Sequence, residues 1–126
     1  MPGDTKLGKI KQMALVFDDV AKVVPFYRDA LGMTLLFEIA GMAFFDAGGV
    51  RLMMTKASSP ELDHPNSILY FDVADIVAAA ADLSKRGVKF LEEPHAVGKT
   101  ATHEVWIAAF KDPEGNFIQL MQEKAL

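Results

Sequence analysis

The side chains that most often carry out chemistry are scarce in this sequence. There is no cysteine, which excludes disulfides, thiolate catalysis and zinc sites built from cysteine. Three histidines are present, His64, His95 and His103, so a metal site or an acid–base site would have to combine them with carboxylates. No Ser–His–Asp arrangement and no glycine-rich phosphate loop is evident. The residue types therefore leave little room for metal or nucleophile chemistry.

The three histidines differ in their surroundings. His64 and His95 each neighbour a proline in a polar segment, so we expect both to be solvated. His103 instead begins the run 103–110, which is β-rich and mostly apolar. We therefore expect His103 to be a polar contact or a proton-transfer group of a site, or alternatively a rim histidine bonded to water.

Length and composition favour one globular domain that stays in solution. The chain has 126 residues, of which 51% are hydrophobic and 24% charged. Its net charge of −4 and the lack of a Lys/Arg block argue against nucleic-acid binding. Because no apolar run reaches about 18 residues and the first segment lacks a signal-peptide core, we expect no membrane contact and a cytoplasmic location.

A repeated order of elements positions these residues. Each half of the chain predicts strand, helix, strand, strand, strand, from its β-rich runs, its helical stripe and its turn residues. The matching features are the first strands at 10–17 and 67–73, the helix starts at Asp19 and Asp75, and the helix ends at Gly32 and Gly87. Aspartates can cap helix N-termini and glycine can adopt the left-handed stop, so both helices have start and end signals.

The segments between these elements carry turn and loop signals. Pro25 lies inside the first helical stripe and predicts a kink or a late start there. The residues at 47–49 and 112–116 predict tight turns between strands. The polar segment 57–66 is expected to be a linker, and 93–102 a loop that is mobile and available for binding.

Two motifs in their respective halves resemble the glyoxalase/bleomycin resistance protein/dioxygenase superfamily, also called the vicinal oxygen chelate fold. They are Phe26-Tyr27 followed by Leu31-Gly32 in the first helix, and Asp112-Pro113-Glu114-Gly115-Asn116 in the last turn. The resemblance implies an α+β fold of two tandem βαβββ modules, which form curved mixed sheets around a cleft. It covers a single domain at 8–124, with modules at about 8–56 and 67–124 joined by the linker. It also implies a homodimer, since exposed sheet edges need covering.

Many members of that superfamily hold a divalent metal with His or Gln and Glu from the first and last strand of each module. By this resemblance the corresponding positions here are Gln12, Met53, Ile68 and Gln119. Isoleucine cannot ligate, a thioether suits hard cations poorly, and glutamine lacks the charge and basicity of glutamate. We therefore expect no metal, no cofactor and no catalytic residue at these positions.

Strand alternation indicates which other side chains share the face of Gln12 and Gln119. Arg51 is the cation of that face, and it could anchor an anionic group of a ligand or pair with Asp72 across the sheets. The face is otherwise mostly apolar, which is typical of small-molecule pockets. Alternatively, Met53, Ile68 and Phe117 simply fill the space between the sheets. The predicted ligand-binding residues are Gln12, Arg51, Met53, Ile68, Tyr70, His103, Ile107 and Gln119.

Three functions are consistent with this sequence. The first is a metal-free protein, similar to bleomycin resistance proteins, that binds a small and largely apolar organic ligand in the cleft. The second is a metal-dependent lyase, isomerase or dioxygenase with a degenerate or relocated metal site. The third is a non-catalytic interaction domain whose cleft is filled. In each case the expected partners are a small molecule or a second copy, and neither nucleic acid nor membrane.

Overall fold

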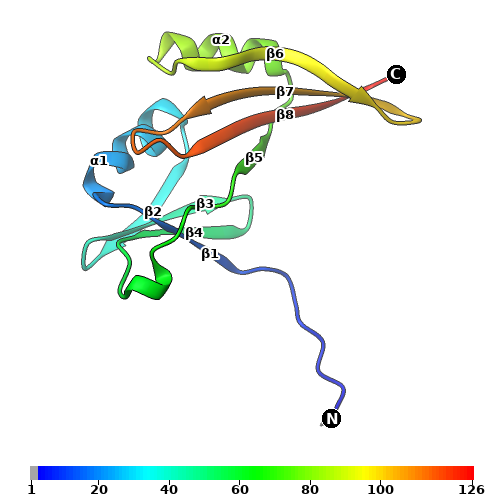
Figure 1. Cartoon of the computed structure of the whole chain (residues 1–126). Helices are drawn as coiled ribbons and strands as arrows, with labels where there is room; N and C mark the ends of the chain where they lie inside the picture. The colour runs from blue at the N-terminus through cyan, green and yellow to red at the C-terminus, as the bar shows by residue number, and fades with distance from the viewer. Residues whose placement is uncertain (1–2) are drawn as a thin grey trace.

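Two four-stranded mixed sheets carry the fold of the computed structural model, which describes residues 3–126 (Figure 1). The first sheet has the strand order β1-β4-β3-β2 and the second has the order β5-β8-β7-β6. In each sheet the first strand pairs parallel with the last, and the other pairs are antiparallel. The strands are β1 (Gln12–Val16), β2 (Thr34–Ile39), β3 (Met42–Ala47), β4 (Val50–Thr55), β5 (Leu69–Asp72), β6 (Phe90–Lys99), β7 (His103–Lys111) and β8 (Phe117–Ala125). The identical order in both halves confirms the two βαβββ modules.

The first helix is interrupted where its proline lies. The α-helix α1 covers Val20–Pro25, and a π-helix, η1, continues it over Phe26–Ala30. Proline has no N–H and its ring crowds the carbonyl one turn earlier, so the regular hydrogen-bond ladder cannot pass through Pro25. After Pro25 the helix widens to π-helical turns, in which the Leu31 N–H donates to the Phe26 carbonyl five residues earlier at 3.0 Å. The expected kink is thus realised as a change of helix type.

The second helix, α2 (Ile76–Lys85), follows the sequence signals closely. The Asp75 carboxylate accepts a hydrogen bond from the Ala78 N–H at 3.1 Å, which is the predicted N-cap. The stripe predicted for this helix is buried at Ile76, Ala80 and Leu83. Both stop glycines adopt positive φ, +72° at Gly32 and +94° at Gly87, which only glycine adopts without strain.

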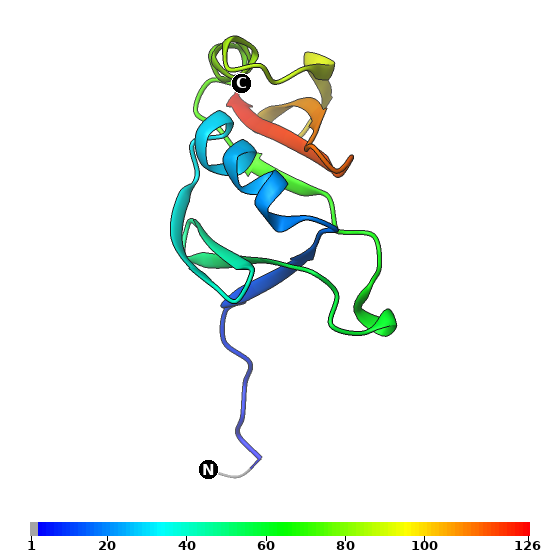
Figure 2. The ribbon, with the colours of Figure 1, turned by 90° about the vertical axis from the view of Figure 1, so that its left-hand side faces the viewer.

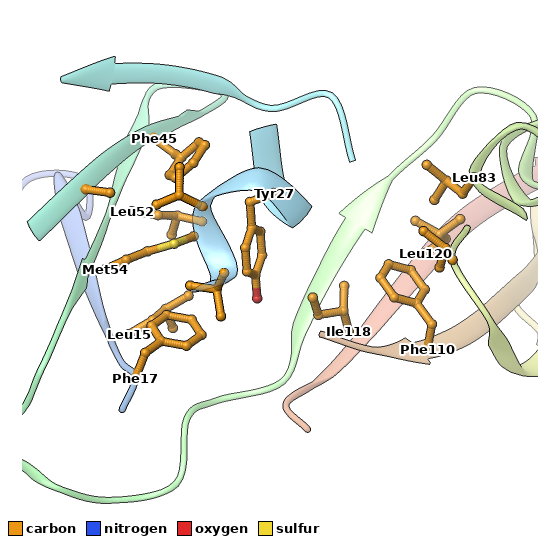
Figure 3. Packing of buried hydrophobic residues seen from close by; sticks show 14 of the residues in the cluster. Leu15, Phe17, Tyr27, Phe45, Leu52, Met54, Leu83, Phe110, Ile118 and Leu120 are labelled. Carbon is orange, nitrogen blue, oxygen red and sulfur yellow. The ribbon is translucent and has the colours of Figure 1, made fainter. Parts of the chain in front are cut away.

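Both sheets bury one face in a single common core. In Figure 2 the first helix lies between the two sheets, and Figure 3 shows Tyr27 between side chains of the first sheet and those of the second. The rings confirm this position, since Tyr27 lies 6.2 Å from Phe45 of β3 and its neighbour Phe26 lies 6.2 Å from Phe110 of β7. The buried cluster joins the two modules and consists of Leu15, Phe17, Val20, Val23, Val24, Tyr27, Ala43, Phe45, Leu52, Met54, Ile76, Leu83, Val88, Ala108, Phe110, Ile118 and Leu120.

The prediction of a loop at 93–102 was wrong. Strand β6 runs through most of it, to Lys99, and pairs with β7 with three register irregularities. Pro94 is tolerated because β6 is an edge strand of the second sheet. The sequence predicted a strand after Gly87 but ended it too early, because the residues beyond Glu93 are held by pairing with the long strand β7 rather than by apolar residues of their own.

The linker between the modules has little regular structure. It contains one short 3₁₀ turn, η2 (Pro60–Leu62), and most of its residues are exposed. The segment before β1 extends away from the sheets in Figures 1 and 2. Among residues 3–126, no helix is both long enough and apolar enough to cross a membrane.

Candidate functional site

The predicted site residues lie on the faces of the two sheets that point away from the common core. Successive side chains of a strand alternate between faces, so each buried residue leaves its neighbours on the opposite side. Leu52 and Met54 of β4 are buried in the core, and therefore Arg51 and Met53 project from the other face. We call this opposite side of each sheet its outer face.

On the outer face of the first sheet, three predicted residues contact one another. Gln12 stands opposite Arg51 across β1 and β4. The Arg51 Nε donates to the Gln12 Oε1 at 2.7 Å, and the Gln12 Nε2 lies 3.7 Å from the Met53 sulfur. The structure therefore brings Gln12, Arg51 and Met53 into contact, with two polar side chains beside a thioether on a largely apolar face.

A second set of predicted residues gathers on the outer face of the second sheet. Gln119 of β8 lies between Tyr70 of β5 and Ala109 of β7 in the strand register. Ile107 lies two residues before Ala109 on β7 and so shares its face. Ile68 directly precedes β5 and lies two residues before Tyr70. The Gln119 Oε1 is buried and accepts no hydrogen bond from residues 3–126, so this oxygen is an unsatisfied acceptor of the face.

His103 does not join either set. It is the first residue of β7 and pairs with Ala125 at the far end of β8. At about 3.4 Å per residue, this places His103 roughly 20 Å along the strand from Ala109, the neighbour of Gln119. Its ring Nδ1 lies 2.8 Å from the Thr102 hydroxyl, so His103 has a local partner at the start of β7.

The other two histidines are exposed. The Nδ1 of His64 lies 3.0 Å from the Pro65 carbonyl, and the Nδ1 of His95 lies 2.7 Å from the Glu93 carbonyl. His95 belongs to β6 rather than to a loop, and its Nε2 lies 3.6 Å from the Glu92 carboxylate. His64 lies in the linker, whereas His95 stands opposite Ile107 in the β6–β7 register, at the β6 edge of the second sheet.

Within one chain the two sets do not meet. Because both sheets turn their other faces to the shared core, the outer faces point away from each other across the molecule. The expected alternative of an Arg51–Asp72 pair is absent, since the ion pairs found within residues 3–126 are Arg28–Asp29 and His95–Glu92. Each outer face therefore holds only part of the set of residues that the sequence predicted around one cleft.

The cavities of the single chain lie elsewhere. One of about 460 Å³ opens between the modules, where the β3–β4 turn approaches β5, and of the predicted ligand-binding residues only Tyr70 lines it. Another of about 300 Å³ lies beside α2 and contains none of them. The site is therefore an open face in one chain rather than an enclosed pocket.

The donor set on these faces does not fit a divalent metal. The only oxygen donor among the two first-sheet positions is the Gln12 Oε1, and it already accepts a hydrogen bond from the cationic Arg51. A guanidinium at that oxygen repels a metal cation, and Met53 offers only a soft sulfur. On the second sheet the corresponding positions are Gln119 and Ile68, and the isoleucine has no atom that can ligate a metal. Within residues 3–126, no group of three His, Asp or Glu side chains has the proximity a metal ion requires.

The two sequence motifs meet in space and hold the modules together. The Tyr27 hydroxyl donates to the Asp112 carboxylate at 2.7 Å, and both residues are buried. Burial, followed by the charge and hydrogen bond of Asp112, raises the pKa of Tyr27 far above its usual value. Asp112 also accepts from the backbone N–H groups of Glu114 and Asn116, which closes the turn.

The same turn caps the first helix. The Glu114 carboxylate accepts hydrogen bonds from the N–H groups of Asp18 and Asp19 at 2.7 and 2.8 Å. Asp19 holds the N-cap position, as predicted, but its own side chain makes no capping hydrogen bond. Asn66 of the linker completes the junction, accepting from the Val16 N–H at 2.8 Å and donating to the Asn116 side chain at 3.1 Å.

Two residues of the outer face were missed in the sequence. Phe37 and Phe44 stack with centroids 4.5 Å apart and lie under the Arg51 guanidinium, at 5.9 and 5.5 Å. A signal for Phe44 existed, because the two-residue turn Gly48-Gly49 fixes the β3–β4 register and places Phe44 opposite Met53. Phe37 had no such signal, since a bulge in β2 shifts its register.

The sequence of this chain is similar to those of known proteins. The family model described as the Glyoxalase/Bleomycin resistance protein/Dioxygenase superfamily matches residues 9–120. The uncharacterized protein YraH of Bacillus subtilis (strain 168) is 27% identical, with the match covering 89% of this chain and 96% of YraH.

Solved structures share the fold at low sequence identity. TnmS3, an antibiotic binding protein from Streptomyces sp. CB03234, has a TM-score of 0.75 and 23% identity, covering 95% of this chain and 99% of TnmS3. Lactoylglutathione lyase from Agrobacterium tumefaciens has a TM-score of 0.70 and 20% identity, covering 94% and 96% of the two chains. The same fold is therefore found in a binding protein and in an enzyme, and does not choose between these functions.

Proposed function

The chain belongs to the glyoxalase/bleomycin resistance protein/dioxygenase superfamily, and we propose that within it this protein is a metal-free binding protein for a small, largely apolar organic ligand. The observation that carries the proposal is the contact between Arg51 and Gln12, which places a positive charge on the oxygen that a metal would need. The apolar surroundings, with a few fixed polar groups, are what small-molecule sites commonly present. The antibiotic-binding protein TnmS3 is a precedent for binding on this fold.

The proposal includes a homodimer that completes the site. Two copies arranged so that the outer face of the first sheet meets the partner's second sheet would bring both predicted sets together. Both faces expose large apolar side chains, including Ile39 at 55%, Ile68 at 48% and Phe117 at 46% exposure, which association would cover.

A cytoplasmic location belongs to the same proposal. The cysteine-free composition is compatible with it, because the chain needs no oxidising compartment for folding. Fractionation of cells that express the tagged chain, with the protein recovered in the cytosolic fraction, is the measurement that tests this.

Binding is tested with an uncharged apolar probe. N-phenyl-1-naphthylamine should gain fluorescence and raise the melting temperature of the purified protein, and EDTA should change neither effect. Met53→Asp places a charge in the apolar face and should abolish binding, whereas Val77→Asp, at an exposed position of α2, should not. Tight stoichiometric uptake of Ni²⁺, Zn²⁺ or Mn²⁺ that Gln12→Ala removes would instead support a metal-dependent enzyme.

Complementation between two variants tests the shared site. Met53→Asp and Tyr70→Asp should each abolish probe binding alone, because every site of either homodimer then carries one charge. In a heterodimer of the two, one site carries both changes and the other carries none, so half of the probe binding should return. No recovery in a purified heterodimer would place the whole site within one chain and contradict the arrangement.

A further inference from the structure

The Arg51 side chain is held in a defined orientation rather than extended into solvent. Its Nε is occupied by the Gln12 Oε1 at 2.7 Å, and its guanidinium lies over the stacked rings of Phe37 and Phe44. These contacts fix the plane of the group from one edge and one face. The terminal nitrogens, which make no hydrogen bond to residues 3–126, are left to point along the outer face of the first sheet.

No carboxylate neutralises this guanidinium within residues 3–126 of one chain. The side chain opposite it in the register is Asp46, but that carboxylate accepts from the Gly49 N–H in the β3–β4 turn and lies beyond ion-pair distance of Arg51. Asp72, the carboxylate that the sequence offered as a partner, lies on the second sheet. The other two arginines do have partners, Arg28 with Asp29 and Arg86 with the Ala30 carbonyl.

A charge in such surroundings favours one kind of ligand. The protein carries a net charge of −4, so an anion gains nothing from its overall field and needs a local cation. Arginine presents parallel N–H groups that suit the two oxygens of a carboxylate or sulfonate. Around it Phe37, Phe44 and Met53 offer an aromatic and thioether surface that suits a flat apolar body.

We propose that the ligand of this face is an aromatic organic anion, in which Arg51 binds the carboxylate or sulfonate while Phe37 and Phe44 position the guanidinium. The inference rests on the proposed function, since it assigns a chemical class to the ligand of the same site. Gln12 acts as a positioning residue, because it fixes the Arg51 Nε and contacts the anion only through it. The class excludes cationic ligands, which the Arg51 guanidinium would repel, and strongly hydrophilic ligands, which would lose hydrogen bonds to water against the aromatic and thioether surface.

Two fluorescent probes that differ in one anionic group test the assignment. They are 8-anilinonaphthalene-1-sulfonate and its uncharged parent N-phenyl-1-naphthylamine, each titrated into the purified full-length protein. In the wild type the sulfonate should bind more tightly than the neutral probe. Arg51→Gln should weaken sulfonate binding by about 10- to 100-fold, the range expected for loss of a hydrogen bond to a charged group, and change the neutral probe by less than about two-fold.

Matched variants separate charge from shape and from folding. Arg28→Gln removes the same charge from an exposed position away from the outer face and should leave both probes unchanged. Arg51→Lys keeps the charge but loses the planar fork, so it should retain part of the preference for the sulfonate. Melting curves of all three variants establish that each is folded before titration.

Three other outcomes would overturn either the inference about Arg51 or the proposed function. If Arg51→Gln leaves sulfonate binding unchanged, or weakens both probes equally, Arg51 is not the partner of the anion and the inference is wrong. If Arg51→Gln weakens dimerisation and neither probe, Arg51 instead pairs with the partner copy, which also overturns the inference. A wild-type protein that binds neither probe contradicts the proposed function itself, and that failure is distinguishable because it appears before any substitution.

Discussion

The hydrogen bond between Tyr27 and Asp112 is the interaction whose loss should most directly loosen the two modules. Tyr27 lies in the first module, Asp112 in the turn of the second, and the tyrosine is 1% exposed. Tyr27→Phe keeps the ring contacts with Phe17 and Phe45 and removes only the hydroxyl. The substitution therefore isolates one buried hydrogen bond to a carboxylate.

The expected cost follows from what remains around Asp112. Its carboxylate still accepts from the backbone N–H groups of Glu114 and Asn116 and from the Asn116 side chain, so it is not left without partners. A hydrogen bond to a charged group contributes about 1.5–3 kcal/mol, and we expect a loss of about 2 kcal/mol in the free energy of unfolding. With an unfolding entropy of about 2.1 cal/mol/K per residue, this lowers Tm by about 8 °C.

Thermal and urea unfolding, followed by circular dichroism, measure this loss. Tyr70→Phe is the matched control, because Tyr70 is 52% exposed and its hydroxyl makes no hydrogen bond to residues 3–126, so its change should stay within about 0.5 kcal/mol. A double-mutant cycle with Asp112→Asn should give a coupling energy of about 1–2 kcal/mol. Equal effects of Tyr27→Phe and Tyr70→Phe, or a coupling near zero, would refute the reasoning.

Two further predictions concern the same junction. The pKa of Tyr27 is raised by burial and by Asp112, so the unfolded chain loses this proton at lower pH than the folded protein does. Above pH about 10, the stability advantage of the wild type over Tyr27→Phe should therefore fall by about 1.4 kcal/mol per pH unit. Urea unfolding across pH 9–11 measures this difference, and a constant difference would contradict the prediction. Glu114→Ala removes both acceptors at the start of α1 and should lower the free energy of unfolding in urea by about 1 kcal/mol. Glu114→Gln keeps one acceptor oxygen and should lower it by less. The reverse order would show that Glu114 does not act as the cap.

Much of the fold could be predicted because its signals are local. The Asp75 cap, the stop glycines Gly32 and Gly87 and the alternating strands all act within a few residues of themselves. The same local rule placed Arg51 and Met53 on one face, and the structure confirms that they share it. The second half of strand β6 was missed because residues 94–99 depend on pairing with β7, which lies outside their own stretch of sequence.

The contacts of the junction could not be predicted in this way. Glu114 caps a helix that begins about 95 residues earlier in the chain, and Asn66 bridges β1 to the last turn. Each contact requires that the modules already be placed against each other. Glu114 and Asn66 are ordinary residue types for a turn and a linker, so neither indicates by itself which distant group it contacts.

The sequence by itself determined the order of the elements, the two-module repeat and the alternation of the regular strands, and with it which side chains of the site lie on one face. Only the tertiary structure decided that the two sheets turn their other faces to one shared core, which separates the Gln12 set from the Gln119 set within a chain. The physical reason is that alternation is a property of the extended backbone, whereas the placement of modules depends on buried contacts such as that of Tyr27 with Asp112, between residues 85 positions apart.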